Sequence, residues 1–508
     1  MSNDLDHLPS LIEYHLNKDD NVSLIDAEID KKIKLKELHL ISKSLQQKLH
    51  TSSLSDKSIV HFIGPNGIGL IAVYCGLLYN NWIPVGSNYT SPLPELIRSI
   101  DATDSQGLVI SRDLWGKYKN ELNCPKLRIV FVFEVCESKG IDIEIEKIEF
   151  DGVEIERENL EDVSIMYMTS GSTGRPKAIM IDHKPLFEAY KRDSRPSCSI
   201  NCQPFCNIGG NYVFWGSMIT STTFIILNEF TPKKYLDVYV KYRGNQLFGT
   251  SAIMNSLSKF PELSDYNFSS TKVIGVVGSK PDVNAIKFIK ETTNIPDRAV
   301  FTTSYASSEA IIAYSTTCSI NNIPERLQEC KDLVQCKIVD LRTNEELQSN
   351  KVGEICVKTP YVMKGYYKDK AKTDAVLTAD GWYHMGDLGS LDENNKLLVV
   401  GRLKEVIKFR GYSVHASELE FILQNHESVA LCAVIDEPHD EHEEIPVAFV
   451  VRKQEVTEEE LLGYVNANVT QYKRLHKVYF IEEMPFNDGM KINKPALKLI
   501  LQRILKYL

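Results

Sequence analysis

The chain has 508 residues, 43% of them hydrophobic and 25% charged, and its formal net charge is −10. One hydrophobic core rarely serves so long a chain, so two or three folding units are expected. The acidic balance argues against nucleic acid as the main partner, because phosphate binding requires a basic face. The polar start Met1–Asp6 differs from a secretory leader, and the longest apolar run, Gly67–Tyr79, falls short of the ~18 residues of a membrane span. We therefore expect a cytoplasmic protein with no membrane span.

Cysteine usage favours reduced thiols over a disulfide framework, since there are eleven cysteines and no secretory leader is expected. Cys198, Cys202 and Cys206 recur at every fourth residue, which could serve a metal on one helix face. Proline breaks around them and the lack of a paired CxxC favour unligated thiols. For His439 and His442, in an acidic loop, solvation is also favoured over metal ligation.

Between residue 55 and about 310, short apolar runs alternate with amphipathic segments. Gly67–Tyr79 is predicted to be a buried helix. The runs rich in β-branched residues are predicted to be strands: Ile59–Ile63, Gly107–Ser111, Leu127–Phe133, Ser164–Met168, Thr222–Leu227 and Lys272–Val277. Strands that alternate with helices predict an α/β domain of mostly parallel sheets covered by helices, and we assign it residues 1–401.

The pattern changes after about residue 400. Gly401–Val414 is polar and turn-rich, and the segments after it predict a smaller α+β domain over residues 402–508. Its expected helices are Ala416–His426, Thr457–Val469 and Ala496–Leu508, and its expected strands are Val429–Ile435, Pro446–Arg452 and Lys477–Ile481. A joint near Arg402–Glu405 predicts two domains with a cleft between them, and such clefts commonly bind ligands.

The segment Thr169–Lys177 reads Thr-Ser-Gly-Ser-Thr-Gly-Arg-Pro-Lys and lies between two apolar, β-rich runs. Its small residues allow backbone amides and hydroxyls to surround phosphate oxygens, and Arg175 and Lys177 supply positive charge. The Gly-Lys-Ser/Thr ending of a P-loop is absent. A flexible linker is the alternative, but a linker has no need of a basic, proline-closed ending between strands. The segment predicts a polyphosphate-binding loop.

This loop resembles the phosphate-binding signature of the adenylate-forming superfamily of acyl- and aryl-CoA synthetases, peptide-synthetase adenylation domains and luciferases. Further segments resemble the blocks of that family in the same order: Asn88–Pro92, Tyr305–Glu309, Gly353–Val357 with Met363–Tyr367, Gly381–Asp387, Gly401–Glu405 with Lys408–Gly411, and Pro485–Lys491. The resemblance covers nearly the whole chain. It implies that ATP activates a carboxylic acid to an acyl-adenylate with release of pyrophosphate, followed by transfer to a thiol.

The resemblance also implies roles for single residues. Lys491 and Glu309 are the expected catalytic residues, and Glu309 suits Mg²⁺ as a hard oxygen ligand. Lys404 is the expected hinge, about which the smaller domain turns between the half-reactions. The expected acid pocket contains Asn207, Gly209 and Tyr212. The expected ATP-binding residues are Thr169, Ser170, Gly171, Ser172, Thr173, Gly174, Lys177, Gly278, Ser279, Lys280, Ser304, Tyr305, Ser308, Asp387 and Arg402. Among them, Tyr305 is suited to adenine, and Asp387 and Arg402 to ribose hydroxyls.

Five positions depart from the family pattern: Ala178, Asn207, Ala306, Ala416 and Met490. They leave the acid and the thiol acceptor open. CoA is favoured as the acceptor, which makes the chain a free-standing acyl-CoA synthetase. A carrier protein acting in trans is one alternative. A non-catalytic relative that binds nucleotide or acyl-adenylate is the other, although a mobile lysine would be of no use to it.

Overall fold

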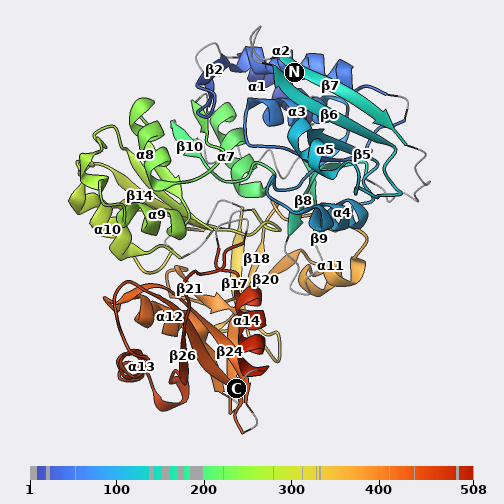
Figure 1. Cartoon of the computed structure of the whole chain (residues 1–508). Coiled ribbons are helices and arrows are strands. Elements are labelled where there is room, and N and C mark those ends of the chain that lie inside the picture. Colours follow the sequence, from blue (N-terminus) through green and yellow to red (C-terminus); the bar gives the residue numbers. More distant parts are fainter. Residues whose placement is uncertain are drawn as a thin grey trace. The chain divides into compact units, whose positions relative to one another are not determined.

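The structure is a computed structural model and describes residues 8–18, 23–51, 53–136, 142–150, 160–169, 177–183, 198–220, 222–278, 280–311, 313–327, 329–330, 333–410, 412–439, 441–487 and 491–506 (Figure 1). The chain divides into two compact units. Unit 1 comprises Met1–Pro324, Lys331–Val334 and Lys358–Tyr383, and unit 2 comprises Glu325–Cys330, Gln335–Val357 and His384–Leu508. Among the described helices, none has the length and apolar character needed to cross a membrane.

The first sheet of unit 1 has the strand order β15-β14-β13-β12-β10-β11-β1-β2. In that order the strands are Tyr314–Ser319, Val300–Tyr305, Val273–Val277, Gln246–Gly249, Ser199–Asn201, Phe224–Ile226, Ser23–Asp26 and Lys31–Lys34. The inner strands pair in parallel, while β15 and β2 add antiparallel pairs. Because carboxyl ends of parallel strands meet at one edge, the segments after β12, β13 and β14 lie along the same edge of the sheet.

The second sheet of unit 1 has the order β19-β9-β8-β4-β3-β5-β6-β7. In that order the strands are Gly365–Tyr366, Lys177–Asp182, Val163–Thr169, Ile83–Gly86, Ile59–Ile63, Gly107–Ser111, Ile129–Cys136 and Asp142–Glu149. The middle strands β8, β4, β3, β5 and β6 pair in parallel. β9, β19 and β7 join the sheet by antiparallel pairs.

The described helices of unit 1 are, in chain order, α1 (Leu8–Lys18), α2 (Leu35–Leu49), α3 (Ile68–Tyr79), α4 (Leu93–Ala102), α5 (Arg112–Tyr118), α7 (Ile208–Ile219), α8 (Pro232–Lys241), α9 (Ser251–Ser258), η2 (Leu263–Asp265), α10 (Val283–Thr292) and α11 (Lys370–Val376). Every residue of α3 is buried, which confirms the predicted buried helix and explains its lack of a polar face. The expected α/β fold of mostly parallel sheets is confirmed.

Unit 2 contains two further sheets and a short strand, β16 (Glu329–Cys330). One sheet has the order β17-β18-β20-β21, with strands Gln335–Val339, Gly353–Lys358, Trp382–Leu391 and Leu397–Arg402. The other has the order β23-β22-β25-β24, with strands Tyr412–His415, Val406–Phe409, Glu443–Arg452 and Val429–His439, and β26 (Lys477–Phe480) pairs with β25. The helical segments are η3 (Leu403–Glu405), α12 (Ala416–Gln424), α13 (Glu458–Asn466), η4 (Gln471–Lys473) and α14 (Lys494–Lys506).

The amphipathic pattern explains how the helices of unit 2 pack. Leu419 and Leu423 of α12, and Leu497 and Leu501 of α14, are buried pairs spaced four residues apart on one helix face. They pack with the inward residues of β24 and β25, such as Phe449, into a single core. The expected helices and strands after residue 415 are confirmed to within a few residues at their ends.

The segment Gly401–Val414, predicted to be only polar and turn-rich, instead contains η3 and the antiparallel hairpin β22–β23. Its alternating pattern, with Ile407 and Phe409 buried and Lys408 exposed, is that of a half-buried strand. The compact unit 2 also includes residues 335–357 and 384–401 in addition to 402–508. The domain boundary at 401/402 and the role of Lys404 as a hinge therefore stay predictions.

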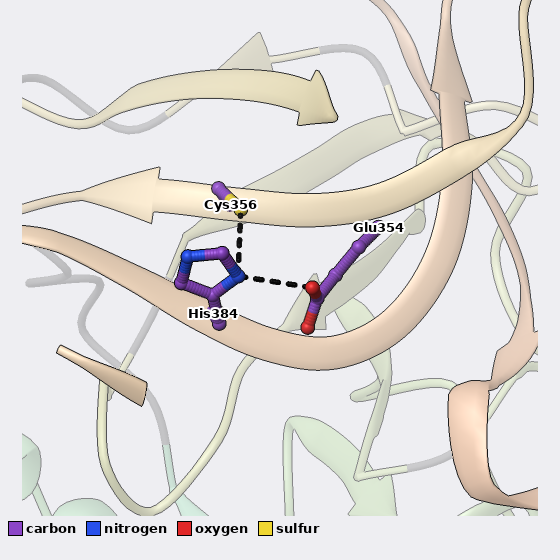
Figure 2. A group of neighbouring side chains, drawn as sticks. All are labelled: Glu354, Cys356 and His384. Carbon is purple, nitrogen blue, oxygen red and sulfur yellow. Dashed lines mark hydrogen bonds and ion pairs between the residues drawn. The ribbon is translucent and has the colours of Figure 1, made fainter. Parts of the chain in front are cut away.

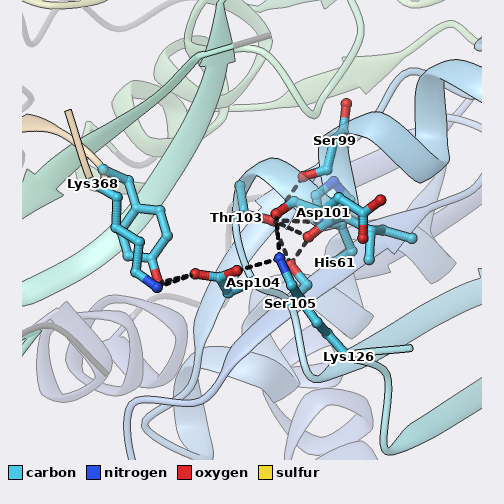
Figure 3. A network of polar contacts seen from close by, with 10 residues as sticks. His61, Ser99, Asp101, Thr103, Asp104, Ser105, Lys126 and Lys368 are labelled. Carbon is cyan, nitrogen blue, oxygen red and sulfur yellow. Dashed lines mark hydrogen bonds and ion pairs between the residues drawn. The ribbon is translucent and has the colours of Figure 1, made fainter. Parts of the chain in front are cut away.

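A buried polar network in unit 1 holds the turn between α4 and β5 (Figure 3). The Asp104 carboxylate accepts a hydrogen bond from Lys126 at 2.6 Å, pairs with Lys368 at 2.6 Å, and accepts another from the Tyr367 hydroxyl at 3.0 Å. Burial alone would raise the pKa of Asp104, but these bonds outweigh it and hold the pKa below its ordinary value. Because Tyr367 and Lys368 directly follow β19, Asp104 anchors that short strand.

The same network surrounds the buried His61 of β3. Its Nδ1 lies 2.9 Å from the Ser105 hydroxyl, and its Nε2 lies 3.0 Å from the Ser87 hydroxyl. Burial lowers the pKa of His61 to about 3, so the imidazole is neutral at physiological pH.

Candidate active site

The two ends of the predicted phosphate loop, Thr169 and Lys177, lie on the paired strands β8 and β9. Thr169 and Lys177 are opposite each other in the register, and the Thr169 hydroxyl donates to the Lys177 carbonyl at 3.4 Å. Antiparallel pairing therefore fixes both ends of the loop, as the two flanking apolar runs suggested. Ser170, Gly171, Ser172, Thr173 and Gly174 lie outside the described residues, as do Arg175 and Pro176.

Two expected site residues of unit 1, Lys177 and Glu309, both contact Tyr366. The Lys177 ammonium is 5.0 Å from the centroid of the Tyr366 ring, and the Tyr366 hydroxyl donates to the Glu309 carboxylate at 3.2 Å. Burial, reinforced by the Glu309 charge, raises the pKa of Tyr366, so its hydroxyl stays protonated as a donor. Backbone pairing places this ring, because Tyr366 of β19 is opposite Ile179 of β9. We name Lys177, Tyr366 and Glu309 the unit 1 group.

The main chain of Glu309 is also fixed, because its carbonyl accepts a hydrogen bond from the Met363 amide at 2.6 Å. Met363 and Tyr366 lie in one of the segments that resemble the family, but sequence reasoning gave Tyr366 no role. Its contact with Glu309 depends on pairing between strands far apart in the sequence. The available signal was an aromatic residue with a hydroxyl beside the expected phosphate loop.

The remaining expected nucleotide residues of unit 1 follow the carboxyl ends of β13 and β14. Gly278 comes directly after β13 with φ of +78°, a left-handed conformation that favours glycine. Asp282 then caps α10 by accepting hydrogen bonds from two backbone amides. The Lys280 carbonyl accepts from the Ser251 hydroxyl at 2.5 Å, which ties the segments after β12 and β13 together.

Ser304 and Tyr305 end β14, and Ser304 is opposite Val277 of β13. They therefore lie on the same sheet edge as Gly278, and Ser308 follows a few residues later. Ser279 lies outside the described residues. In open α/β sheets this edge is where ligands bind.

The expected acid-pocket residues lie at the start of α7. Asn207 is the N-cap residue, Gly209 is in the first turn, and Tyr212 is half-buried one turn later. A Cβ on Gly209 would lie 2.4 Å from Oε1 of Gln203, so the side chain of Gln203 occupies the space beside this glycine. Sequence reasoning missed Gln203, because a glycine in the sequence does not show which side chain lies against it.

Unit 2 places Asp387 and Arg402 directly opposite each other on β20 and β21. Arg402 Nε lies 3.0 Å from the Asp387 carboxylate. The Asp387 side chain is buried, whereas the Arg402 side chain is half exposed. A buried carboxylate held by one arginine in this way keeps a fixed orientation, which suits it to bind hydroxyl groups.

Lys491 lies at the end of a closed loop in unit 2. The Asn487 side chain accepts from the Lys491 amide at 3.0 Å, the Asn487 amide donates to the Lys491 carbonyl at 2.8 Å, and Phe486 pairs with Ile492. Lys491 is exposed at the surface, yet the surrounding protein displaces enough water to lower the pKa of its ammonium. Arg402 lowers this pKa further and Asp387 raises it, so the three residues are electrostatically coupled. We name Asp387, Arg402 and Lys491 the unit 2 group.

Lys404 lies in η3, and its neighbour Glu405 is held by a lysine three residues after Lys491. Lys494 Nζ lies 2.6 Å from Glu405 and 2.8 Å from Glu420 of α12. Burial alone would lower the pKa of Lys494, but the two carboxylates outweigh it and raise the pKa. The segment with the expected hinge and the loop with Lys491 are thus linked by ion pairs inside unit 2.

A further cluster in unit 2 contains Glu354 and Cys356 of β18 and His384 of β20 (Figure 2). Nδ1 of His384 lies 2.9 Å from Glu354 Oε2 and 3.5 Å from Cys356 Sγ. Burial, together with the Glu354 charge, raises the pKa of Cys356 to about 12, so the group is a thiol and not a thiolate at neutral pH.

The residues at Glu309 fit a magnesium ion on their donor chemistry. Mg²⁺ prefers one or two carboxylates together with phosphate oxygens. Among the described residues, Tyr366 is the side chain that hydrogen-bonds the Glu309 carboxylate, which leaves lone pairs on both oxygens.

The comparisons with known proteins agree with this geometry. AMP-binding enzyme is the family matched by residues 16–367, and AMP-binding enzyme C-terminal domain is matched by residues 418–488. A 4-coumarate–CoA ligase of Pinus taeda is 28% identical over 97% of this chain and 95% of its own length. A 4-coumarate–CoA ligase 3 of Arabidopsis thaliana is 31% identical over 66% of this chain and 63% of its own length.

Among solved structures, ATP-bound MatB from Rhodopseudomonas palustris has the same fold, with a TM-score of 0.84, 20% identity, and coverage of 98% of this chain and 99% of that one. The first family match spans well over half of the present chain. The chain therefore belongs to the AMP-binding enzyme family and is an ATP-dependent, AMP-forming acid–thiol ligase.

Proposed function

We propose that this enzyme converts a carboxylic acid to its CoA thioester through an acyl-adenylate. The observation that carries the proposal is the unit 1 group, in which a cation from the phosphate-loop hairpin lies over the ring of one tyrosine and a carboxylate suited to Mg²⁺ accepts from its hydroxyl. Such an arrangement serves a polyphosphate that carries a metal ion. CoA as the acceptor is supported by the 4-coumarate–CoA ligases, which align over most of the chain.

In the first half-reaction, an oxygen of the substrate carboxylate attacks the α-phosphorus of ATP, and the bond to the leaving pyrophosphate breaks. Lys177 neutralises charge on the β- and γ-phosphates, and the loop residues Thr169–Gly174 donate hydrogen bonds to them. Glu309 would hold Mg²⁺, which supplies further charge neutralisation when bound. The Tyr366 hydroxyl orients the Glu309 carboxylate. Gly278–Lys280 and Ser304, Tyr305 and Ser308 bind the adenine end from the sheet edge.

Asp387 and Arg402 bind the ribose hydroxyls, and Lys491 places its ammonium between the attacking carboxylate and the α-phosphate. Burial and the nearby Arg402 lower the pKa of the Lys491 ammonium, whereas Asp387 raises it. In the second half-reaction, the thiol sulfur attacks the acyl carbon, the thiol proton is lost, and AMP leaves. Movement about Lys404 between the two steps removes Lys491 and admits the thiol.

The acid binds beside α7, where Asn207, Gly209 and Tyr212 line the pocket and Gln203 adds a polar group. Hydroxycinnamates are the first acids to test, because the full-length relatives are named as coumarate ligases. A cytoplasmic site of action is part of the same proposal, in keeping with the acidic composition.

The acceptor is tested by forming the acyl-adenylate with radiolabelled acid and ATP and then adding either CoA or a panel of phosphopantetheinylated carrier proteins. We expect a labelled CoA thioester, with release of AMP, at a rate at least tenfold above that with any carrier. Faster loading of a carrier protein would overturn CoA as the acceptor. Accumulation of adenylate that no thiol discharges would support a role that ends at adenylation.

A further inference from the structure

The carboxylate of Glu354 has two partners on either side of a single residue of β20. Its Oε2 lies 2.9 Å from His384 Nδ1 (Figure 2). Its Oε1 accepts a hydrogen bond from the Gly386 amide at 3.3 Å. The side chains of Glu354 and His384 are both largely buried. One carboxylate therefore spans the segment that ends directly before Asp387.

The backbone at Gly386, which the Glu354 carboxylate holds, has an unusual conformation. Gly386 has φ of +68°, in the left-handed region, and no atom of the described residues lies within 4 Å of the place where its Cβ would be. Glycine is thus required here by conformation and not by lack of space. The bond from the Gly386 amide to Glu354 holds this residue and sets the direction in which the chain enters Asp387.

Asp387 is sensitive to small changes in that direction. Its carboxylate is buried, pairs with Arg402 at 3.0 Å, and contributes to the electrostatic environment of Lys491. The Asp387–Arg402 pair therefore depends on the position of the backbone that carries Asp387. Glu354 therefore influences Asp387, the expected ribose contact, through its hydrogen bond to the Gly386 amide and through the backbone that joins Gly386 to Asp387.

Glu354, His384 and the neighbouring Cys356 could also be read as a metal site, since their ligand atoms lie within 4.8 Å of one another. The chemistry favours another role. The Glu354 carboxylate is already engaged on both oxygens, by His384 and by the Gly386 amide. The shared Nδ1 of His384 is already in hydrogen-bond contact with Glu354.

We propose that Glu354 is a positioning residue for nucleotide binding, which fixes the Asp387 carboxylate for the ribose hydroxyls by holding His384 and the Gly386 amide. This inference rests on the proposed role of Asp387. It gives a role to Glu354 of β18, which acts through Asp387 and not by its own contact with the nucleotide. It also explains why Glu354 contacts both His384 and Gly386, the residues of β20 that lie just before Asp387.

The test compares ATP with 2′-deoxyATP and 3′-deoxyATP in acid-dependent pyrophosphate exchange, using wild type, Glu354→Gln and Glu354→Ala. Wild type should discriminate against the analogue that lacks the hydroxyl bound by Asp387. Glu354→Ala should raise the KM for ATP about tenfold, in keeping with a misplaced charged hydrogen bond, and raise the KM for that analogue less than threefold. The kcat should change less than the KM, and Glu354→Gln, which keeps one acceptor oxygen, should recover part of the loss.

Glu393→Gln is the matched control, because Glu393 lies in the exposed turn between β20 and β21. There its carboxylate accepts a hydrogen bond from the side-chain amide of Asn350. It should leave every KM unchanged, and circular dichroism should show the same unfolding transition for all variants. Equal KM increases for ATP and both analogues in Glu354→Ala would overturn the inference while leaving the role of Asp387 intact. A wild-type enzyme that does not discriminate between the nucleotides would overturn the role of Asp387 and the inference with it. Stoichiometric zinc in the purified wild type, lost in Glu354→Ala, would also overturn it.

Discussion

The unit 1 group and the unit 2 group bring charged residues together in different ways. Asp387 and Arg402 face each other on neighbouring antiparallel strands, so their ion pair follows from the register of one hairpin. Lys177 and Glu309 both contact Tyr366, which reaches its place through the pairing of two strands that are distant in the sequence. The Asp387–Arg402 pair is therefore set by local structure, whereas the unit 1 group depends on long-range packing.

This difference has a consequence for stability. The pair on one hairpin depends mainly on the backbone of β20 and β21, including the residue before Asp387 that Glu354 holds. A group that depends on β19 also depends on what anchors β19, and that anchor is the buried Asp104 with Tyr367 and Lys368. Four predictions separate the two groups, from the largest expected effect to the smallest.

Replacing Lys491 by alanine should reduce adenylation by ~10²–10⁴-fold, because one positioned cation is lost from the transition state. The unfolding temperature should not change, since the residue is exposed. Pyrophosphate exchange measures the first effect and a thermal melt the second. Lys506→Ala, which removes an exposed lysine from the end of α14, is the control and should keep full activity. A decrease of less than threefold for Lys491→Ala would contradict the catalytic role.

The buried His61 should make unit 1 sensitive to moderate acid. Its pKa is about 3 in the folded chain and about 6.5 in the unfolded chain, so the stabilisation is complete above pH 6.5 and is lost as the pH falls toward 3. The loss between pH 7 and pH 4 should be about 3 kcal/mol. Urea unfolding across this range should show a shallower decline in His61→Gln than in wild type. The exposed His50, replaced in the same way, should leave the slope unchanged, and equal slopes in all three proteins would contradict the assignment.

Asp104→Asn should destabilise unit 1 by about 2 kcal/mol, because it leaves two lysines without their shared partner while both can still reach solvent. The pKa of Asp104 lies below its ordinary value, so its contribution is present above pH ~4 and is lost at lower pH as the carboxylate protonates. The variant should therefore approach the stability of wild type as the pH falls below ~4. Asp297→Asn, in an exposed pair with Lys290, should cost less than about 0.5 kcal/mol in the same melts.

Tyr366→Phe should lower the exchange rate about fivefold, because Glu309 loses one hydrogen bond while the ring over Lys177 remains. The Mg²⁺ concentration for half-maximal rate should rise by a similar factor. Tyr366→Leu should be worse, since it also removes the ring. The control is Tyr242→Phe, which removes another tyrosine hydroxyl that donates to a carboxylate, that of Asp30. If Tyr366→Phe has no effect on the Mg²⁺ requirement, Tyr366 does not orient Glu309.

The two groups also differ in how far the sequence predicted them. Strands such as Ile59–Ile63 and Gly107–Ser111 were predicted to the residue, because continuous apolar runs bounded by turn residues are a local signal. The loop at Thr169–Lys177 was correctly placed between two strands for the same reason. The contact between Tyr366 and Glu309 was not predicted, because no local pattern shows that β19 pairs with β9.

Other omissions have the same physical origin. The hairpin β22–β23 was overlooked because its polar residues dominate the composition, although Ile407 and Phe409 alternate with exposed residues as in a strand. Gln203 was not expected beside Gly209, because the space next to a glycine is filled from elsewhere in the fold. Glu354 and His384 belong to segments that were noted for their resemblance, but their hydrogen bond depends on the alignment of β18 with β20.

The most direct test of the whole account is acid-dependent exchange of radiolabelled pyrophosphate into ATP by the wild-type chain, measured with fatty, aryl and amino acids. The account predicts that at least one acid supports exchange well above the rate without acid, and that Lys491→Ala reduces this exchange to near the background. Exchange that is independent of acid, or equal in wild type and Lys491→Ala for every acid, would contradict adenylation by this site.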